Sequence, residues 1–534
     1  MFIVASAAAA ACGSEDDKKR APGDGGGAGG EAGVPGSAGG DASLGNAGTG
    51  GDDSVTPLGG AAGASTPPVG GATDGGAGGV GSVTPFNGLY VGPAGDDGEG
   101  DGTTDNPFAT LVKAAASAQP GDTIVFLAGT YPQLAGATIP DGVDVMAETA
   151  GSVTLQGQGT TTLLNLAGTT RIDGLKFQTF GTVVKFVEGA TATGKLTIVD
   201  STFTQCQITC LELSGTTQTI VNVGAAAVLA NGGANFALLS EQANLNLAGG
   251  IIQGFTGNVF NVADDAVVAV KNSDISGSNT TGQAFLLNQK ASASLDNVTV
   301  AIGGNSLITL KGQSTLSITD SNLMSLATPA YHCVRSEMDG AGSITITDSK
   351  LHDCGNGLSS TIPGQLTLTR VEFYQMTTSG IDMGAGFQGA GGVIRITDSK
   401  FHDCPLAMRL GSGSNFNDIK VRGTSFVSST AGWDTVIVDS YGVSTVDLCT
   451  LAEPGGNTFQ NGNANQTALR NGGTGLYVSA VGNTWSPDEQ SADGSGHYAA
   501  PQGAGNKLEA ALVNSGRNYV VPYTGSKILL AQNP

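Results

Sequence analysis

Apolar side chains recur about every 25 residues through the middle of this chain, and this period restricts the fold more than any other feature. Successive members are separated by 22 to 28 residues. A near-constant period of this length is typical of repeat architectures, in which each repeat buries its apolar face only against its neighbours. The twelve residues that set the period are Phe177, Phe203, Val228, Ile252, Ile275, Val300, Leu323, Leu351, Phe373, Phe401, Phe426 and Leu451.

Short alternating runs of apolar and polar residues fill each repeat. Runs such as Ile346–Leu351 and Ile396–Phe401 read as strands, and Gly, Asn, Asp or Ser separate one run from the next. About three such strands per repeat predict a parallel β-helix. Its coils stack at ~4.8 Å, so the twelve residues would form an inward ladder roughly 50 Å long. No helical pattern occurs between Thr160 and Ala480, which argues against helical repeats.

Composition separates the N-terminal stretch from the rest. The chain holds 85 glycines among 534 residues and has a formal charge of −22, which argues against nucleic acid and anionic membrane surfaces as partners. Residues 13–85 contain no aromatic side chain. Such a segment cannot offset the entropy of ordering its backbone, so residues 12–85 are predicted to be a disordered Gly/Ala/Asp-rich tether.

The first residues form an apolar run that ends in Ala9–Ala11 and Cys12. A short apolar segment before small residues is typical of a secretory leader. The motif resembles the lipobox of bacterial lipoproteins. That resemblance implies that residues 1–11 are a signal peptide, that Cys12 is lipidated, and that the protein is anchored at the outer membrane or cell surface through this lipid only. The alternative is a low-complexity alanine run with a chance cysteine.

The folded body is expected to begin near Phe86. Asn106 and Pro107 precede good helix formers and predict the start of a helix that closes the open end of the solenoid. Residues 86–170 are therefore assigned to an N-terminal cap with the first coils, residues 171–485 to the β-helix, and residues 486–534 to a C-terminal cap.

Several short motifs at both ends of this body suggest a family. They resemble the opening and the terminal coils of a bacterial domain-of-unknown-function family of surface lipoproteins, in the pectate-lyase-like right-handed parallel β-helix superfamily. The resemblance implies an all-β right-handed β-helix, but no particular activity, because the superfamily holds lyases, hydrolases and adhesins. The motifs are Tyr90–Gly92, Gly95–Asp105, Asn106–Thr110, Asp122–Ile124, Ala128–Tyr131, Pro454–Phe459 and Gly482–Trp485.

Five short runs align on one strand of successive coils, and their middle residues would point outward. This alignment places Arg335, Ser359, Asp382 and Arg409 on four consecutive coils. Two arginines and an aspartate suit the binding of an acidic sugar, with Arg335, Asp382 and Arg409 as ligand-binding candidates. The alternative is a surface salt-bridge ladder of little energetic value. The runs are Leu211–Leu213, Val334–Ser336, Leu358–Ser360, Ile381–Met383 and Met408–Leu410.

Catalysis is weakly indicated. A pair of adjacent carboxylates occurs at Asp264 and Asp265, but the chain lacks the Gly-His-Gly and Arg-x-Lys motifs that accompany such a pair in polygalacturonases. Coils of this length also leave little chain for the loops of a deep cleft. We assign no catalytic residues, and a polysaccharide lyase or glycosidase with a nonstandard site between Leu323 and Phe426 stays an alternative.

Six cysteines follow Cys12. Cys206 and Cys210 flank one turn, and Cys333 and Cys354 flank the same turn on adjacent coils, so both pairs can reach disulfide distance. Buried free thiols are the alternative. The repeated motifs His352–Cys354 and His402–Cys404 do not predict a shared zinc site, because two coils separate them by ~9–10 Å. Each is interpreted as an inward cysteine beside a solvated histidine.

One acidic loop has the oxygen density of a calcium site. Its carboxylates are Asp96, Asp97, Asp101 and Asp105, although the spacing is not that of an EF-hand. A solvated Gly/Asp loop is the alternative reading, and calcium is the only cofactor considered.

These observations together predict a lipid-anchored β-helix that binds polysaccharide or cell-envelope material without catalysis. A protein-binding adhesin or scaffold is a further alternative to the enzyme.

Overall fold

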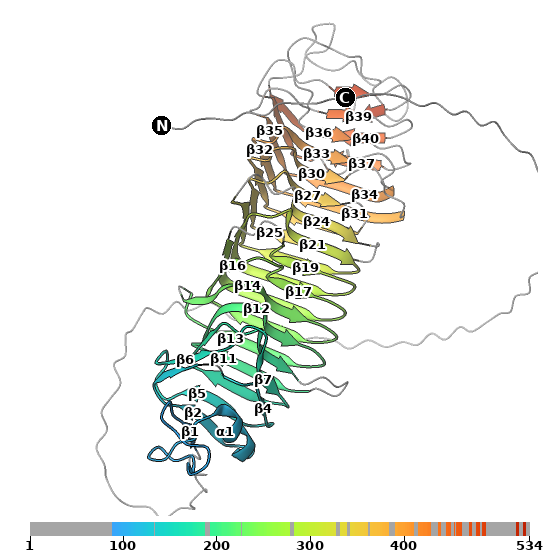
Figure 1. The fold of residues 1–534 in the computed structure, drawn as a ribbon. Coiled ribbons are helices and arrows are strands. Elements are labelled where there is room, and N and C mark those ends of the chain that lie inside the picture. Colours follow the sequence, from blue (N-terminus) through green and yellow to red (C-terminus); the bar gives the residue numbers. More distant parts are fainter. Residues whose placement is uncertain are drawn as a thin grey trace, which may run out of the picture. The chain divides into compact units, whose positions relative to one another are not determined.

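The chain folds into a right-handed parallel β-solenoid in a computed structural model (Figure 1). The sequence-based assignments for residues 1–85, including the leader, Cys12 and the tether, lie outside the described residues. The structure describes residues 88–132, 134–186, 193–225, 227–277, 282–326, 332–338, 342–360, 364–383, 390–410, 415–428, 436–438, 445–449, 453, 455–461, 469–471, 477–480, 483–486, 520–522 and 527–529.

Each coil contributes one strand to each of three stacks of parallel strands, which we call sheets A, B and C. Long strands that bend from one sheet into the next join the three sheets into one hydrogen-bonded set. Sheet A contains β1 (Gly88–Val91), β2 (Thr123–Phe126), β5 (Asp144–Ala147), β8 (Thr170–Asp173), β11 (Lys195–Val199), β13 (Gln218–Asn222), β15 (Asn244–Ala248), β22 (Thr315–Thr319), β25 (Ser343–Thr347), β28 (Gln365–Thr369), β31 (Ala390–Thr397), β34 (Asn415–Arg422), β37 (Thr445–Cys449), β40 (Tyr477–Ala480) and β43 (Lys527–Leu529).

Sheet B contains β3 (Gly129–Tyr131), β6 (Val153–Gln156), β9 (Leu175–Gln178), β16 (Ile251–Phe255), β23 (Asn322–Ser325), β26 (Lys350–His352), β29 (Glu372–Tyr374), β32 (Lys400–His402), β35 (Ser425–Ser428), β38 (Thr458–Asn461) and β41 (Thr484–Ser486). Sheet C contains β4 (Ala137–Ile139), β7 (Thr162–Leu166), β10 (Thr182–Phe186), β17 (Phe260–Val262), β19 (Phe285–Leu287), β21 (Ser306–Gly312), β24 (His332–Met338), β27 (Asn356–Ser360), β30 (Ser379–Met383), β33 (Leu406–Leu410), β36 (Val436–Val438), β39 (Leu469–Asn471) and β42 (Val520–Pro522).

Four long strands belong to two sheets each. β12 (Thr202–Leu213) and β14 (Val228–Leu239) continue from sheet B into sheet C, whereas β18 (Val267–Gly277) and β20 (Ser292–Ile302) continue from sheet A into sheet B. The ladders run without interruption from β1, through the expected boundary at residue 170, to β42 and β43.

The repeated Asp-Ser step before the sheet B strand explains part of the sequence rhythm. Asp348 and Asp398 adopt positive φ angles of 49° and 50°, which turn the chain from sheet A to sheet B in one residue. The serine that follows is buried: Ser349 Oγ donates to Thr347 O at 2.6 Å and accepts the backbone N–H of Ser321, one coil away, at 3.1 Å. Each coil thus supplies a hydrogen-bond partner to its neighbour inside the solenoid.

The interior ladder of sheet B contains ten of the twelve predicted residues in register. Phe373 stacks on Phe401 with ring centroids 4.6 Å apart, and Phe401 stacks on Phe426 at 5.2 Å. All three rings are essentially inaccessible to solvent. Such stacked pairs add to the burial of apolar surface that holds the coils together.

Of the other two predicted ladder residues, one is wrong and one lies outside the described residues. Ala230, not Val228, pairs with Phe203 and Ile252, because a register irregularity between Val228 and Ala230 shifts the strand; Val228 is 41% exposed. The partner of Phe426 is Phe459, whereas Leu451 lies outside the described residues. Counting residues assumes a regular coil, so it gives the wrong register where a strand contains a bulge.

The N-terminal end carries one short helix, α1 (Leu111–Ser117), beside β1, β2 and β4 (Figure 1). The predicted helix exists but starts later than expected: its N-cap is Thr110, whose Oγ1 accepts from the N–H of Lys113, and not Asn106. Thr110 itself is held by Asp97 through a side-chain hydrogen bond of 2.6 Å. Among the described residues, no helix is long and apolar enough to cross a membrane.

Candidate functional site

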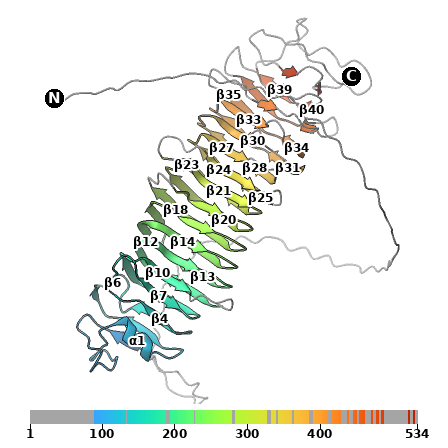
Figure 2. The same ribbon diagram turned by 45° about the vertical axis from the view of Figure 1, so that its right-hand side comes forward.

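The outer face of sheet C carries the predicted row of polar residues. Strand pairing sets Arg335 beside Ser359, Ser359 beside Asp382, and Asp382 beside Arg409, on four consecutive coils. The strands that carry them, β24, β27, β30 and β33, follow one another along the solenoid in both views (Figures 1 and 2). We call these four residues the sheet C row. The sequence predicted this alignment, because inward residues flank each of them.

The first member of the row belongs to an ion network. Arg335 Nη2 lies 2.5 Å from Glu337 Oε1, and Lys311 Nζ lies 3.7 Å from Glu337 Oε2. All three side chains are partly exposed, so the energetic value of these pairs is small. One carboxylate between two cations leaves a net positive charge at this end of the row.

Asp382 and Arg409, at the other end of the row, have fewer hydrogen-bond and ion-pair partners than Arg335. Asp382 Oδ1 is enclosed and has no hydrogen-bond partner, and no ion pair joins Asp382 to the exposed Arg409 among the described residues. Burial raises the pKa of the Asp382 carboxyl, although the charge of Arg409 opposes the rise. The predicted alternative, a closed ladder of surface salt bridges, therefore applies to Arg335 but not to Asp382 and Arg409.

A buried polar ladder lies beside the row, at the start of the same strands. Ser379 Oγ donates to Asn356 Oδ1 at 2.7 Å, and Asn356 Nδ2 lies 3.2 Å from His332 Nδ1. Burial, together with the charge of Arg335, lowers the pKa of His332 to about 4, although Glu337 opposes the shift. A neutral His332 can accept the Asn356 hydrogen bond through Nδ1, so the geometry and the pKa agree.

Both disulfides considered from the cysteine spacing are present. Cys206 is bonded to Cys210 and Cys333 to Cys354, with Cα–Cα distances of 5.2 Å and 5.7 Å. The second bridge joins the coil that carries Arg335 to the next coil. Cys404 is a buried free cysteine, and burial raises the pKa of its thiol to about 12.

A column of rings on the outer face of sheet B went unrecognised in the sequence. Tyr374 stacks between His352 and His402, with centroid distances of 4.5 Å and 5.3 Å and nearly parallel planes. The expectation of solvated histidines is wrong for His352, which is 7% exposed because the Tyr374 ring covers it. The signal available was the tyrosine one residue after the ladder position Phe373, equivalent to both histidines.

Both histidines of this column have acceptors at each ring nitrogen. His352 Nδ1 lies 2.6 Å from Asp353 Oδ2 and its Nε2 2.9 Å from Asn322 Oδ1. His402 has the corresponding contacts with Asp403 Oδ2 at 2.8 Å and Glu372 Oε1 at 2.9 Å. A neutral ring donates to one of its two oxygen neighbours and a protonated ring to both, and in either form the ring nitrogens face groups of the column itself. The column therefore offers few free polar atoms to a ligand.

The acidic loop uses its carboxylates for its own folding. Asp96 Oδ1 accepts the N–H groups of Gly98 and Glu99, and Asp101 Oδ1 accepts from Thr103. Hydrogen bonds from Glu99 and Gly98 lower the pKa of Asp96. Asp105 is exposed. No group of three or more His, Cys, Asp or Glu side chains arranged for a metal occurs within the described ranges, and calcium at this loop stays a prediction.

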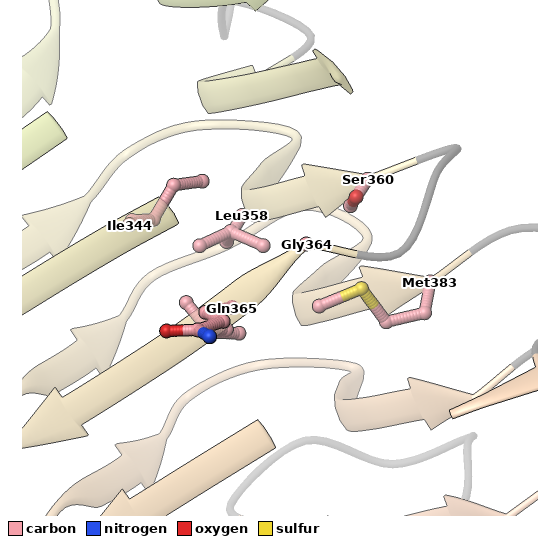
Figure 3. Close-up of a pocket in the computed structure, with 7 residues that line it drawn as sticks. Ile344, Leu358, Ser360, Gly364, Gln365 and Met383 are labelled. Carbon is pink, nitrogen blue, oxygen red and sulfur yellow. The ribbon is translucent and has the colours of Figure 1, made fainter. Parts of the chain in front are cut away.

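The described part of the solenoid contains a small cavity beside the sheet C row. A cavity of about 10 Å³ lies in the corner between sheets C and A, lined by Leu358, Met383 and Ile344 among others (Figure 3). This volume is at the lower limit for a single water molecule. A ligand would have to bind on the outer surface.

No protein-family model and no curated protein matches the chain. Among solved structures it is similar to the Dettilon tailspike protein gp208 (16% identity over 74% of this chain and 67% of that one, TM-score 0.29). It is also similar to the alginate lyase AlyF-OU02 in complex with G6 (12%, 69% and 77%, TM-score 0.25) and to the catalytic unit of a GH87 α-1,3-glucanase from Streptomyces thermodiastaticus strain HF3-3 (14%, 74% and 68%, TM-score 0.29). With TM-scores below 0.3, these similarities carry no argument about function.

Proposed function

We propose that this protein binds an acidic polysaccharide on the outer face of sheet C without cleaving it. The observation that carries the proposal is the sheet C row itself: charged and hydroxyl side chains in register on four consecutive coils. The coil spacing of ~4.8 Å repeats these groups along the solenoid axis, so a polymer lying along that axis can meet several of them.

The charges in the row support an anionic ligand. Arg409 is exposed and has no ion pair among the described residues, so its planar guanidinium is available for a bidentate contact with a carboxylate. Arg335 presents a second guanidinium, which Glu337 orients. Asp382, between them, can accept hydrogen bonds from sugar hydroxyls through Oδ2.

Catalysis is not proposed, because the row lacks a second carboxylate beside Asp382 that could share acid and base work. The lipid anchor at Cys12, the position at the outer membrane or cell surface and the tether of residues 12–85 belong to this proposal. They would display the solenoid away from the membrane.

The test is a binding screen of the full chain on immobilised uronate-containing and neutral polysaccharides, with and without Ca²⁺, followed by analysis of every bound polymer for cleavage. Arg409→Ala and Arg335→Ala should each weaken binding about tenfold, the loss of one charge-assisted contact. Arg171→Ala, on the outer face of sheet A, is the matched control and should bind normally.

Three results would contradict the proposal. Unsaturated or reducing-end products would identify a lyase or glycosidase. Normal binding by both row variants would place the ligand on another surface. No binding to any polysaccharide would favour the protein-binding scaffold.

A further inference from the structure

A depression of about 680 Å³ lies on the surface beside the sheet C row, over the turns that lead from sheet C to sheet A. It covers three consecutive coils, at the ends of β17, β19 and β21. These three strands follow one another along the solenoid in Figure 1. Most of the side chains that line it are polar: Asn288, Gln289, Lys290, Lys311 and Gln313. It is large enough for a ligand of several sugar units, in contrast to the interior cavity.

Tight backbone turns form the floor of this depression. Gln289 and Gly312 both adopt positive φ angles, 62° and 65°, at equivalent places on adjacent coils. A Cβ on Gly312 would come within 2.8 Å of the carbonyl oxygen of Gln289, so only glycine allows the two turns to stack this closely. The Gln313 N–H donates to that same carbonyl. The backbone of these turns is therefore the bottom of the depression, and the side chains beside them, which we call the rim, surround it.

The rim carries an unpaired cation. Lys290 is exposed and has no ion pair within the part of the chain that the structure describes. Some lysines on the solenoid surface have carboxylate partners, for example Lys185 with Glu212 at 2.9 Å and Lys271 with Asp296 at 3.2 Å. Others, such as Lys176 and Lys195, resemble Lys290 in having no ion pair among the described residues. Asp264, one coil before Lys290, accepts the backbone N–H of Glu241 through Oδ2 at 3.0 Å.

The depression is continuous with the sheet C row. Leu287 pairs with Leu310, which places Asn288 beside Lys311, and Lys311 pairs with Glu337. Glu337 in turn contacts Arg335, the first member of the row. Cationic and polar groups thus extend from Lys290 to Arg409.

We propose that this depression is a second subsite for the same polysaccharide, in which Lys290 and Lys311 bind the carboxylate of a uronic acid unit. This inference rests on the proposed function. Lys290 lies two coils before Arg335, about 10 Å along the axis, so a chain on the row would enter the depression only when it is long enough. Amide groups of Asn288, Gln289 and Gln313 would receive the sugar hydroxyls.

Affinity measured against chain length tests this inference. Short and long oligogalacturonates are titrated into the full-length protein and into Lys290→Gln, Lys311→Gln and the double variant. Lys271→Gln, an exposed lysine of sheet A, is the matched control. Lys290→Gln, which leaves the ion network of Glu337 with Lys311 and Arg335 intact, should bind long oligomers about tenfold more weakly and short oligomers unchanged, because short chains are held by Arg335 and Arg409. The double variant should lose at least as much affinity for long oligomers.

The two proposals fail differently. If the double variant matches the control for every length while Arg409→Ala binds weakly, the second subsite is wrong and the proposed function stands. If Arg409→Ala also binds normally, or no oligomer binds, the proposed function is wrong and the subsite falls with it. Unfolding midpoints equal to those of the parent protein verify that each variant is folded.

Discussion

Two outward columns of the same solenoid differ in how completely their polar groups are satisfied. On sheet B, the rings of His352, Tyr374 and His402 cover one another, and both histidines have an acceptor at each nitrogen. On sheet C, Asp382 keeps an oxygen without a partner, and Arg409 is exposed. A satisfied column stabilises the fold. On sheet C the exposed Arg409 has interactions left for a ligand, whereas the enclosed Asp382 Oδ1 is an unsatisfied buried oxygen that lowers stability.

The neighbours of each column explain the difference. Glu372 lies between Lys350 and Lys400 at 3.6 Å and 3.4 Å. Burial opposes its ionisation, but hydrogen bonds from His402 and Lys400 hold the pKa of Glu372 below its ordinary value. Asp382 has one cation nearby and no hydrogen-bonded partner for Oδ1, so burial prevails and its pKa rises.

The largest expected effect concerns the disulfide at the turn between the two columns. Replacing Cys333 and Cys354 by serine should lower the free energy of unfolding by about 3 kcal/mol, because the bridge closes a long loop. The same change at Cys206 and Cys210, only 4 residues apart, should lower it by about 2 kcal/mol. Denaturant unfolding of both double variants measures the difference. Equal losses would show that loop length does not govern these bridges.

Acid should lower the free energy of unfolding through protonation of His332, on sheet C. Its pKa is lowered from 6.5 to about 4 in the fold, so its contribution is fully present above pH 6.5 and is lost as the pH falls toward 4. The loss should be on the order of 2–3 kcal/mol. Asp382 acts in the opposite sense, because a raised carboxyl pKa makes acid favourable. His332→Asn should show a smaller acid loss than the parent protein, and an unchanged loss would mean another group titrates.

Tyr374→Ala tests whether the sheet B column is purely structural. Losing two ring contacts should lower the free energy of unfolding by about 2 kcal/mol and leave polysaccharide affinity unchanged. Val427→Ala, at the next place in the column, is the control and should lose less. A loss of binding with unaltered stability would reverse the roles assigned to the two columns.

The smallest effect is a gain. Asp382→Asn should raise the free energy of unfolding near neutral pH by about 1 kcal/mol, because it removes a partly buried charge whose Oδ1 lacks a donor. Asp348→Asn, whose carboxylate is held by Arg370, should show no gain. If Asp382→Asn lowers the free energy of unfolding instead, the charged Asp382 carboxylate stabilises the fold, and the proposed contrast between the two columns is wrong.

The candidate row was predictable from the sequence, but its chemistry was not. Small or apolar residues on either side of Arg335, Asp382 and Arg409 are enough to align the runs and turn their middle residues outward. The contact between Glu337 and Arg335, and the lack of a hydrogen-bond partner for Asp382 Oδ1 among the described residues, depend on side chains outside the aligned positions. The depression at Lys290 depends on turn stacking, which a strand pattern does not describe.

The sequence by itself determined the repeat, the three-strand coil and most of the interior ladder, because a solenoid repeats the same local pattern and each coil packs only on its neighbours. Tertiary structure decided where the period slips, as at Val228, since a coil absorbs an extra residue without a visible change in pattern. It also decided that His352 is covered by Tyr374 and that Lys290, which has no ion pair among the described residues, lies at the surface depression. Those facts depend on contacts between coils 22 or more residues apart, and only the stacking register brings such residues together.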